Sequence, residues 1–161
     1  DHTIQRTYQA LAWGVLRPLN GKIETLIGRS RKNRQLMSVT EITGKKSITN
    51  YKTLKVFNIK DIPKISFVEC ELETGRTHQI RVHMAYKNNS LLGDQQYGKK
   101  NLRFKKINEE FEDKLKVLNR QALHAKSLGF IHPTSKKLLS FESKLPNDFK
   151  KILDLLNKLS H

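Results

Sequence analysis

Cysteine is nearly absent from this sequence. Cys70 is the single cysteine among 161 residues, so the chain forms no internal disulfide and has no cysteine cluster that would hold zinc. Residues 68–73 alternate apolar and acidic side chains with the period of two that is typical of a half-buried strand. Cys70 lies on the apolar side of that alternation, which predicts a buried structural thiol. A sequence without disulfides fits a reducing compartment, and we expect the cytoplasm.

Long apolar runs are also missing. No run approaches the ~18 consecutive apolar residues typical of a membrane-spanning helix, and no signal peptide is visible. The apolar fraction, 37%, is low for a globular domain, yet 161 residues suffice for one compact core. Because the sequence shows no repeats and no clear linker, we expect a single domain over residues 1–161 that acts as a monomer and makes no membrane contact.

Acidic residues are scarce relative to basic ones. The 31 Lys and Arg outnumber the 15 Asp and Glu, which leaves a formal net charge of +16. This excess is larger than solubility requires, and it indicates a polyanionic partner. The alternative is a lysine-rich composition shared by all proteins of an AT-rich genome, which the abundance of Lys, Asn and Ile would also explain.

A turn at residues 72–83 organises the rest of the chain; it reads L-E-T-G-R-T-H-Q-I-R-V-H. The pattern predicts a buried strand that turns tightly into a short helix. Gly75 would permit the turn through backbone angles closed to other residues, and the Thr77 hydroxyl would cap the helix. Ile80 and Met84 would lie on its core-facing side. Two arginines and two histidines around one turn indicate an anionic ligand or a carboxylate partner.

Residues 75–83 resemble the signature G-R-T-H-Q-I/L-R-V-H of the RluA-type pseudouridine synthases at every position. Other elements of that family follow in order: R-T-Y-Q-A-L at 6–11, similar to K-x-Y-x-A-L; I-G-R at 27–29; R-x-x-M-x-V at 34–39; T-x-Y at 49–51; L-L-G-D-x-x-Y-G at 91–98; and R-Q-A-L-H-A at 120–125. The family's G-H-P before L-L-G-D is replaced by Asn88, Asn89 and Ser90. That departure affects any contact made by the His or Pro, but not the expected fold.

This resemblance implies an activity and a set of site residues. Members of the family isomerise uridine in RNA to pseudouridine without a metal or organic cofactor. Tyr8 corresponds to the Tyr that packs on the target base, Arg81 to the Arg that pairs with the catalytic carboxylate, and Ile80 to the apolar residue beside the base. We expect Arg76 and His78 to contact the substrate as well. The partner is therefore expected to be RNA, and by analogy ribosomal RNA of the large subunit.

The catalytic carboxylate of the family belongs to an Arg-Leu-Asp tripeptide well before the Tyr, and these 161 residues contain no Arg-Leu-Asp. The resemblance therefore implies the C-terminal portion of a catalytic domain. The segment with the Asp, and any N-terminal RNA-binding domain, would lie outside it, and this portion alone would be inactive. The alternative is a non-catalytic RNA-binding relative. A structural ribosomal protein is a distant third, because it explains the charge but not the ordered motifs.

Four basic residues crowd the segment between two expected strands, namely Arg29, Arg31, Lys32 and Arg34. Like charges at this density either face bulk water or meet phosphates, and we favour phosphates. A second basic run comprises Lys99, Lys100, Arg103, Lys105 and Lys106. A solvated insertion explains that run equally well.

Three ionisable residues outside the signature have structural interpretations. Asp94 is expected to fix its loop by accepting hydrogen bonds from backbone N–H groups, as Asp does at turns. His124 and His132 have no acid or cysteine nearby in the pattern, so we expect packing and hydrogen bonding from them.

The predicted fold is α+β, with a mixed, largely antiparallel sheet and a few helices. Strands are expected over residues 3–13, 22–27, 47–57, 65–73 and 123–131, with a hairpin partner at 138–141, and helices over 77–86, 108–118 and 148–159. Asn20 and Gly21 predict a hairpin turn ahead of the second strand. Residues 44–46 predict another turn, and Asn147 or Asp148 would cap the last helix.

Overall fold

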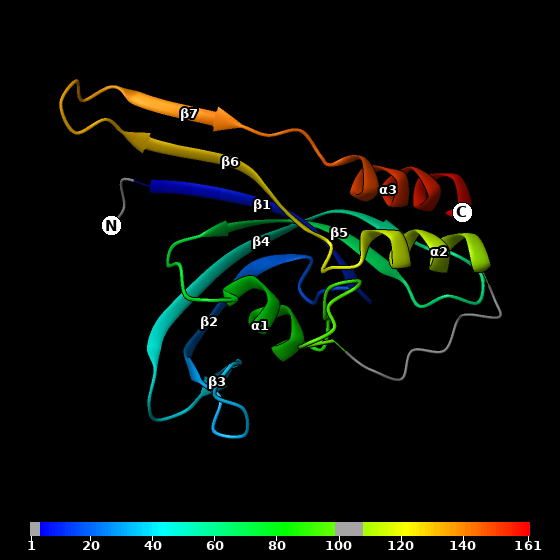
Figure 1. Cartoon of the computed structure of the whole chain (residues 1–161), viewed down its shortest axis with the longest axis horizontal. Helices are drawn as coiled ribbons and strands as arrows, with labels where there is room; N and C mark the ends of the chain where they lie inside the picture. The colour runs from blue at the N-terminus through cyan, green and yellow to red at the C-terminus, as the bar shows by residue number, and fades with distance from the viewer. Residues whose placement is uncertain (1–3, 99–107) are drawn as a thin grey trace.

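One antiparallel sheet forms the framework of the molecule (Figure 1). The computed structural model describes residues 4–98 and 108–161, so the basic run at 99–106 lies outside the described residues. The strands within those ranges are β1 (Ile4–Trp13), β2 (Asn20–Arg29), β3 (Met37–Thr40), β4 (Lys45–Phe57), β5 (Ile65–Leu72), β6 (Leu123–Ile131) and β7 (Leu138–Glu142). They form a 7-stranded sheet in the order β3-β2-β4-β5-β1-β6-β7. Every pairing between described strands is antiparallel.

The helices of the described ranges divide between the two faces of this sheet. They are α1 (Gln79–Tyr86), α2 (Glu109–Leu118) and α3 (Asn147–Leu159). Successive side chains of a strand point to opposite faces. Leu11 and Trp13 of β1 therefore pack with α2 and α3, whereas Ala10 and Ala12 pack in a separate cluster with α1. Each face thus has its own buried core, and α1 covers the face opposite to the α2–α3 pair.

This architecture confirms the predicted α+β class and its largely antiparallel sheet. The predicted strands and helices are present close to their expected bounds, and β6 pairs with β7 as the predicted hairpin. The Asn108 side chain caps α2 by accepting a hydrogen bond from Phe111 N at 2.9 Å. Cys70 is fully buried in β5, and burial together with the Glu69 charge raises its pKa to about 12, as befits a structural thiol. No helix in the described ranges is long and apolar enough to cross a membrane.

The predicted hairpin at Asn20 and Gly21 is wrong. These residues open β2, and β1 and β2 are not neighbours, because β1 pairs with β5 and β6 while β2 pairs with β3 and β4. Gly21 lies opposite Tyr51, where a Cβ would come within 2.9 Å of the Tyr51 hydroxyl. The glycine therefore makes room for a buried tyrosine and does not form a turn.

Two further local predictions also need correction. Gly44 adopts a φ of 121° at the end of the β3–β4 connection, but the two lysines that follow it already belong to β4. Pro146 is the N-cap of α3 and contributes no side-chain hydrogen bond, so neither Asn147 nor Asp148 caps that helix. The Asp148 carboxylate accepts hydrogen bonds from Arg120 at 2.5 and 3.0 Å, and its Oδ1 also accepts one from the backbone N–H of Phe149 at 2.8 Å. Asp148 therefore pairs with Arg120 from a position inside the first turn and does not occupy the N-cap position.

Candidate active site and nucleic-acid interface

The turn from β5 into α1 is held by one buried amide, Gln79, which is 2% exposed. Its Oε1 accepts hydrogen bonds from Arg76 N at 3.0 Å and from the Thr74 hydroxyl at 2.9 Å. Its Nε2 donates to Ile48 O and to the Thr49 hydroxyl, both at 3.0 Å. One side chain therefore joins the turn to β4. The sequence reasoning missed Gln79; the only signal was a neutral amide inside an otherwise cationic turn.

His78, and not Thr77 or Gly75, carries the unusual backbone of this turn. His78 is the N-cap of α1 with φ 56° and ψ 23°, in the left-handed region, and no side chain caps the helix. The predicted Thr77 cap is therefore wrong. Gly75 does not adopt a positive φ; instead, a Cβ at this position would overlap the Arg6 guanidinium. A left-handed conformation is costly for a residue other than glycine, and such strain is concentrated at functional sites.

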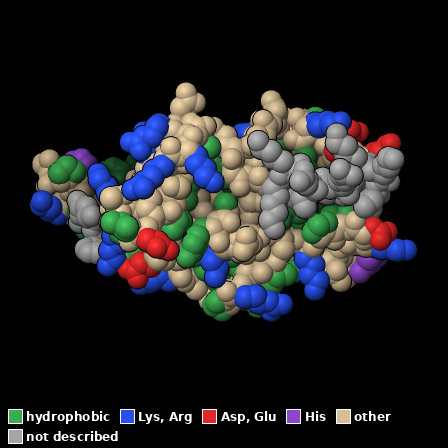
Figure 2. All heavy atoms as spheres, turned by 90° about the horizontal axis from the view of Figure 1, so that it is seen from below, with side chains coloured by type: hydrophobic (Ala, Val, Ile, Leu, Met, Phe, Trp, Pro, Cys, Tyr) green, Lys and Arg blue, Asp and Glu red, His purple; other side chains and the backbone are tan. Residues whose placement is uncertain are grey.

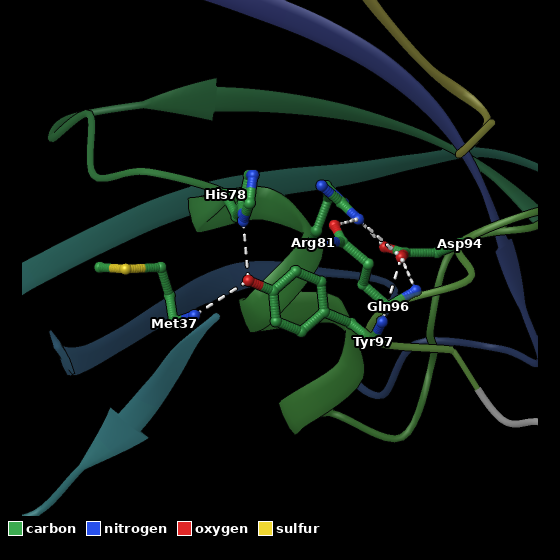
Figure 3. A network of polar contacts seen from close by, with 6 residues as sticks. All are labelled: Met37, His78, Arg81, Asp94, Gln96 and Tyr97. Carbon is green, nitrogen blue, oxygen red and sulfur yellow. Dashed lines mark hydrogen bonds and ion pairs between the residues drawn. The ribbon is translucent and has the colours of Figure 1, made fainter. Parts of the chain in front are cut away.

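Arg81 is buried and pairs with the carboxylate of Asp94, a residue of this chain. Its Nε and Nη2 donate to the two oxygens of Asp94 at 2.9 and 2.8 Å, and Nη2 also donates to Gln96 Oε1 at 2.8 Å (Figure 3). Asp94 additionally accepts from the backbone N–H groups of Gln96 and Tyr97, which confirms its predicted role in fixing the loop. Burial alone would raise the pKa of Asp94, but these hydrogen bonds and the Arg81 charge outweigh burial and lower that pKa.

Tyr97 connects Arg81 to the edge of the sheet. Its ring lies 4.8 Å from the guanidinium carbon of Arg81, within the range of a cation–π contact. Its hydroxyl accepts from Met37 N at 3.0 Å and lies 2.7 Å from His78 Nδ1 (Figure 3). Burial, and then the Arg81 charge, lower the pKa of His78, which favours the neutral form of its imidazole. Tyr97 thus joins β3, the strained start of α1 and Arg81.

His83 anchors α1 to the sheet beneath it. It is 0% exposed, and its two ring nitrogens lie 2.8 Å from the Thr25 hydroxyl and 2.7 Å from the Thr49 hydroxyl. Burial lowers its pKa to about 4. His83 belongs to the signature at residues 75–83, yet its role between two threonines could not be read from sequence spacing.

The two other histidines singled out from the sequence make the expected structural contacts. His124 Nε2 lies 3.0 Å from the backbone oxygen of Ser143, and His124 is 8% exposed. His132 Nδ1 accepts from the backbone N–H groups of Thr134 at 3.2 Å and Ser135 at 3.1 Å. Both predictions of hydrogen bonding are confirmed.

A cavity of about 280 Å³ brings together five of the predicted site residues, contributed by β1, the turn and α1. Tyr8, Arg76, His78, Ile80 and Arg81 line it, together with Leu72, Gln79, Gln121 and Leu123. Its walls therefore combine an aromatic ring, apolar side chains and cations. Such a lining suits a planar, polar ligand with negative charge nearby.

The four remaining predicted residues line a different hollow of about 480 Å³, formed with β3 and the β3–β4 connection. These residues are Arg29, Arg31, Lys32 and Arg34. The Arg29 guanidinium donates to the backbone oxygen of Arg34 at 3.4 Å, which partly orders the loop. Figure 2 shows Lys and Arg side chains spread along the visible face of the molecule, with fewer Asp and Glu between them. Cations are therefore available to phosphate at many places on this face. The hollow is distinguished by having four of the chain's cations in its lining.

Comparison with known proteins gives consistent matches. The family model described as RNA pseudouridylate synthase matches residues 1–86. Ribosomal large subunit pseudouridine synthase D of Neisseria meningitidis is 43% identical over 157 residues, covering 97% of this chain and 40% of that protein. The protein of the same name from Zymomonas mobilis is 42% identical, covering 97% and 46%. The chain therefore spans less than half the length of these relatives.

A solved structure matches the fold as well. Human RNA Pseudouridylate Synthase Domain Containing 1 aligns with a TM-score of 0.69 at 22% identity, covering 96% of this chain and 66% of that one. At this level of identity the likeness establishes the arrangement of strands and helices.

Proposed function

This chain belongs to the RNA pseudouridylate synthase family, and on that premise we propose that it forms part of an enzyme that isomerises uridine to pseudouridine in RNA. In this reaction the bond between ribose C1′ and uracil N1 breaks and a C1′–C5 bond forms. The proton on C5 is lost and N1 gains one, so the reaction needs no net oxidant, reductant or co-substrate.

The shared cavity of Tyr8, Ile80 and Arg81 is the observation that carries this proposal. A uridine must leave its stack to react, which costs a few kcal/mol, and contact with an aromatic ring offsets part of that cost. We assign the target base to the ring of Tyr8, with Ile80 as the apolar contact beside it. Arg76 and His78 also line the cavity, and we assign them to the ribose and its phosphates.

We assign Arg81 the task of holding the nucleophilic carboxylate in its ionised form. A carboxylate in a partly closed pocket needs a cation beside it to stay charged. Asp94 and Gln96 engage Nε and Nη2 of Arg81, and we propose that Nη1 receives the incoming carboxylate. Asp94 would then fix the orientation of the guanidinium and would not take part in the reaction.

The nucleophile itself, we propose, comes from a segment outside these 161 residues, because they contain no Arg-Leu-Asp. The residues would then be the C-terminal portion of a catalytic domain, and this portion alone would not turn over RNA. The relatives, of which this chain spans 40% and 46%, leave ample length for such a segment. The missing tripeptide also favours one alternative, a non-catalytic protein that only binds RNA.

For the substrate we propose large-subunit ribosomal RNA, because relatives from two bacteria carry that activity in their names. We propose that four cations bind the phosphates of this RNA, namely Arg29, Arg31, Lys32 and Arg34. Phosphate contacts do not depend on the base sequence of the RNA. We further propose a cytoplasmic monomer; the buried free thiol of Cys70 is compatible with a reducing compartment.

Tritium release tests the activity directly. RNA labelled with tritium at C5 of uridine loses the label to water only when the C5 proton is lost. We expect release by the full-length product of the gene that encodes these residues, with a metal chelator present, and none by residues 1–161 alone. If the full-length protein binds the RNA without releasing tritium, the non-catalytic alternative is correct.

A further inference from the structure

Arg6 lies beside the cavity, and its contacts in the fold do not explain why an arginine occupies this position. It precedes Tyr8 by two positions on β1, so both side chains point to the same face of the sheet. Its guanidinium rests against Gly75, where any Cβ would overlap it. Gly75 lies between Leu72 and Arg76, which both line the cavity. The glycine of the turn therefore accommodates this arginine at the edge of the site.

The Arg6 guanidinium has no protein acceptor in the part of the chain that the structure describes. Its Nε is buried without a hydrogen-bond partner, and no carboxylate of the described residues forms an ion pair with it. Arg81 and Arg120, by contrast, have the carboxylates of Asp94 and Asp148. A buried donor without an acceptor is destabilising, and more so when it is charged. Such a group persists where a ligand satisfies it.

We propose that Arg6 binds a phosphate of the RNA strand, the one attached to the nucleotide whose base rests on Tyr8. This inference rests on the proposed function. Alternate residues of a strand lie roughly 6.8 Å apart, which is close to the separation of a base from its own phosphate. A guanidinium also matches the geometry of phosphate oxygens with two parallel donors. A carboxylate from another protein segment is the competing ligand.

RNA affinity as a function of salt tests this assignment with four single variants of the 161-residue chain and one double variant. The probe is a fluorescein-labelled oligouridylate of about ten nucleotides. Arg6→Gln removes the charge, Arg6→Lys keeps it, and Gly75→Ala displaces the guanidinium without removing it. Lys150→Gln is the matched control, because Lys150 is exposed on α3, across the sheet from the cavity.

For Arg6→Gln we expect roughly tenfold weaker binding at low salt. The slope of log affinity against log salt should also be smaller in magnitude by about 0.7, the value for one phosphate contact on a single strand. Gly75→Ala should reproduce the weaker binding, and combining it with Arg6→Gln should add little. Arg6→Lys should keep the slope, and Lys150→Gln should match the unchanged chain.

Two outcomes overturn the proposal and are distinguishable. If the unchanged chain binds the probe in a salt-dependent manner and Arg6→Gln binds equally well with the same slope, Arg6 serves the protein and not the RNA. A fall in unfolding temperature in that variant would then identify a structural or protein-carboxylate contact. If the unchanged chain does not bind at all, the proposed RNA function fails together with this inference.

Discussion

Arg81 and His83 lie two residues apart on α1 and have opposite electrostatic requirements. Arg81 is 7% exposed, and its guanidinium is paired with the Asp94 carboxylate. His83 is 0% exposed, and burial between the hydroxyls of Thr25 and Thr49 lowers its pKa, which favours the neutral imidazole. The helix therefore presents a paired cation to the cavity and an uncharged imidazole to the sheet. The buried histidine has a consequence for pH dependence.

Folding should weaken below neutral pH because of His83. Its pKa is lowered from 6.5 to about 4 in the folded protein, so above pH 6.5 neither state binds the proton and the stabilisation is fully present. Between these values the unfolded chain is protonated while the folded one is not, so stability falls as pH falls. The total loss is up to about 3 kcal/mol.

A variant that cannot titrate isolates this effect from other groups. We expect the free energy of unfolding, measured by urea denaturation, to fall by ~2 kcal/mol more in the unchanged protein than in His83→Gln when the pH changes from about 7 to about 5. Equal falls in the two proteins would show that His83 is not the group responsible.

The elements that carry the site show which features the sequence could predict. The strand, the turn and the helix follow from alternation at residues 68–73 and from the family signature, and Asp94 was correctly assigned to its loop. The sequence does not predict the roles of Gln79 and His83. Gln79 bonds to Thr49, and His83 bonds to Thr25 and Thr49, and only the pairing of the strands brings these threonines close to the helix. The cap predicted at Thr77 is wrong because the N-cap is His78, which has a left-handed backbone and whose side chain contacts the distant Tyr97 hydroxyl.

Phe111 should anchor α2 without affecting the cavity on the other face of the sheet. It is fully buried and packs edge-to-face on Trp13 with ring centres 6.2 Å apart. Phe111→Ala should therefore reduce the free energy of unfolding by about 3–5 kcal/mol, measured by urea denaturation, and leave the RNA affinity of the folded protein unchanged. Val117→Ala, at a position 73% exposed on the same helix, should cost less than about 0.5 kcal/mol. A loss of RNA affinity that exceeds the unfolded fraction would contradict this separation of the two faces.

The molecule as a whole carries a charge of +16, which should dominate RNA affinity. Six to ten phosphate contacts would weaken binding by roughly 10³–10⁵ between about 50 and 200 mM salt. This chain is smaller than the enzymes it resembles, so we predict the direction of the change and not its size. Fluorescence anisotropy with a structured RNA measures it, and an affinity that does not change across that range would contradict an electrostatic interface.

The central proposal is that the cavity of Tyr8, Ile80 and Arg81 carries the chemistry, whereas the hollow of Arg29, Arg31, Lys32 and Arg34 only binds RNA. Single-turnover rates of the full-length protein on saturating RNA test this proposal. Arg81→Lys keeps a cation for Asp94 but loses the planar fork, so we expect the rate of tritium release to fall by about 10²-fold, equivalent to roughly 2.7 kcal/mol, with RNA affinity nearly unchanged. Arg31→Ala should bind RNA slightly more weakly and react at the normal rate once bound. If Arg81→Lys reacted normally while Arg31→Ala did not, the active site would not be the cavity of Tyr8, Ile80 and Arg81.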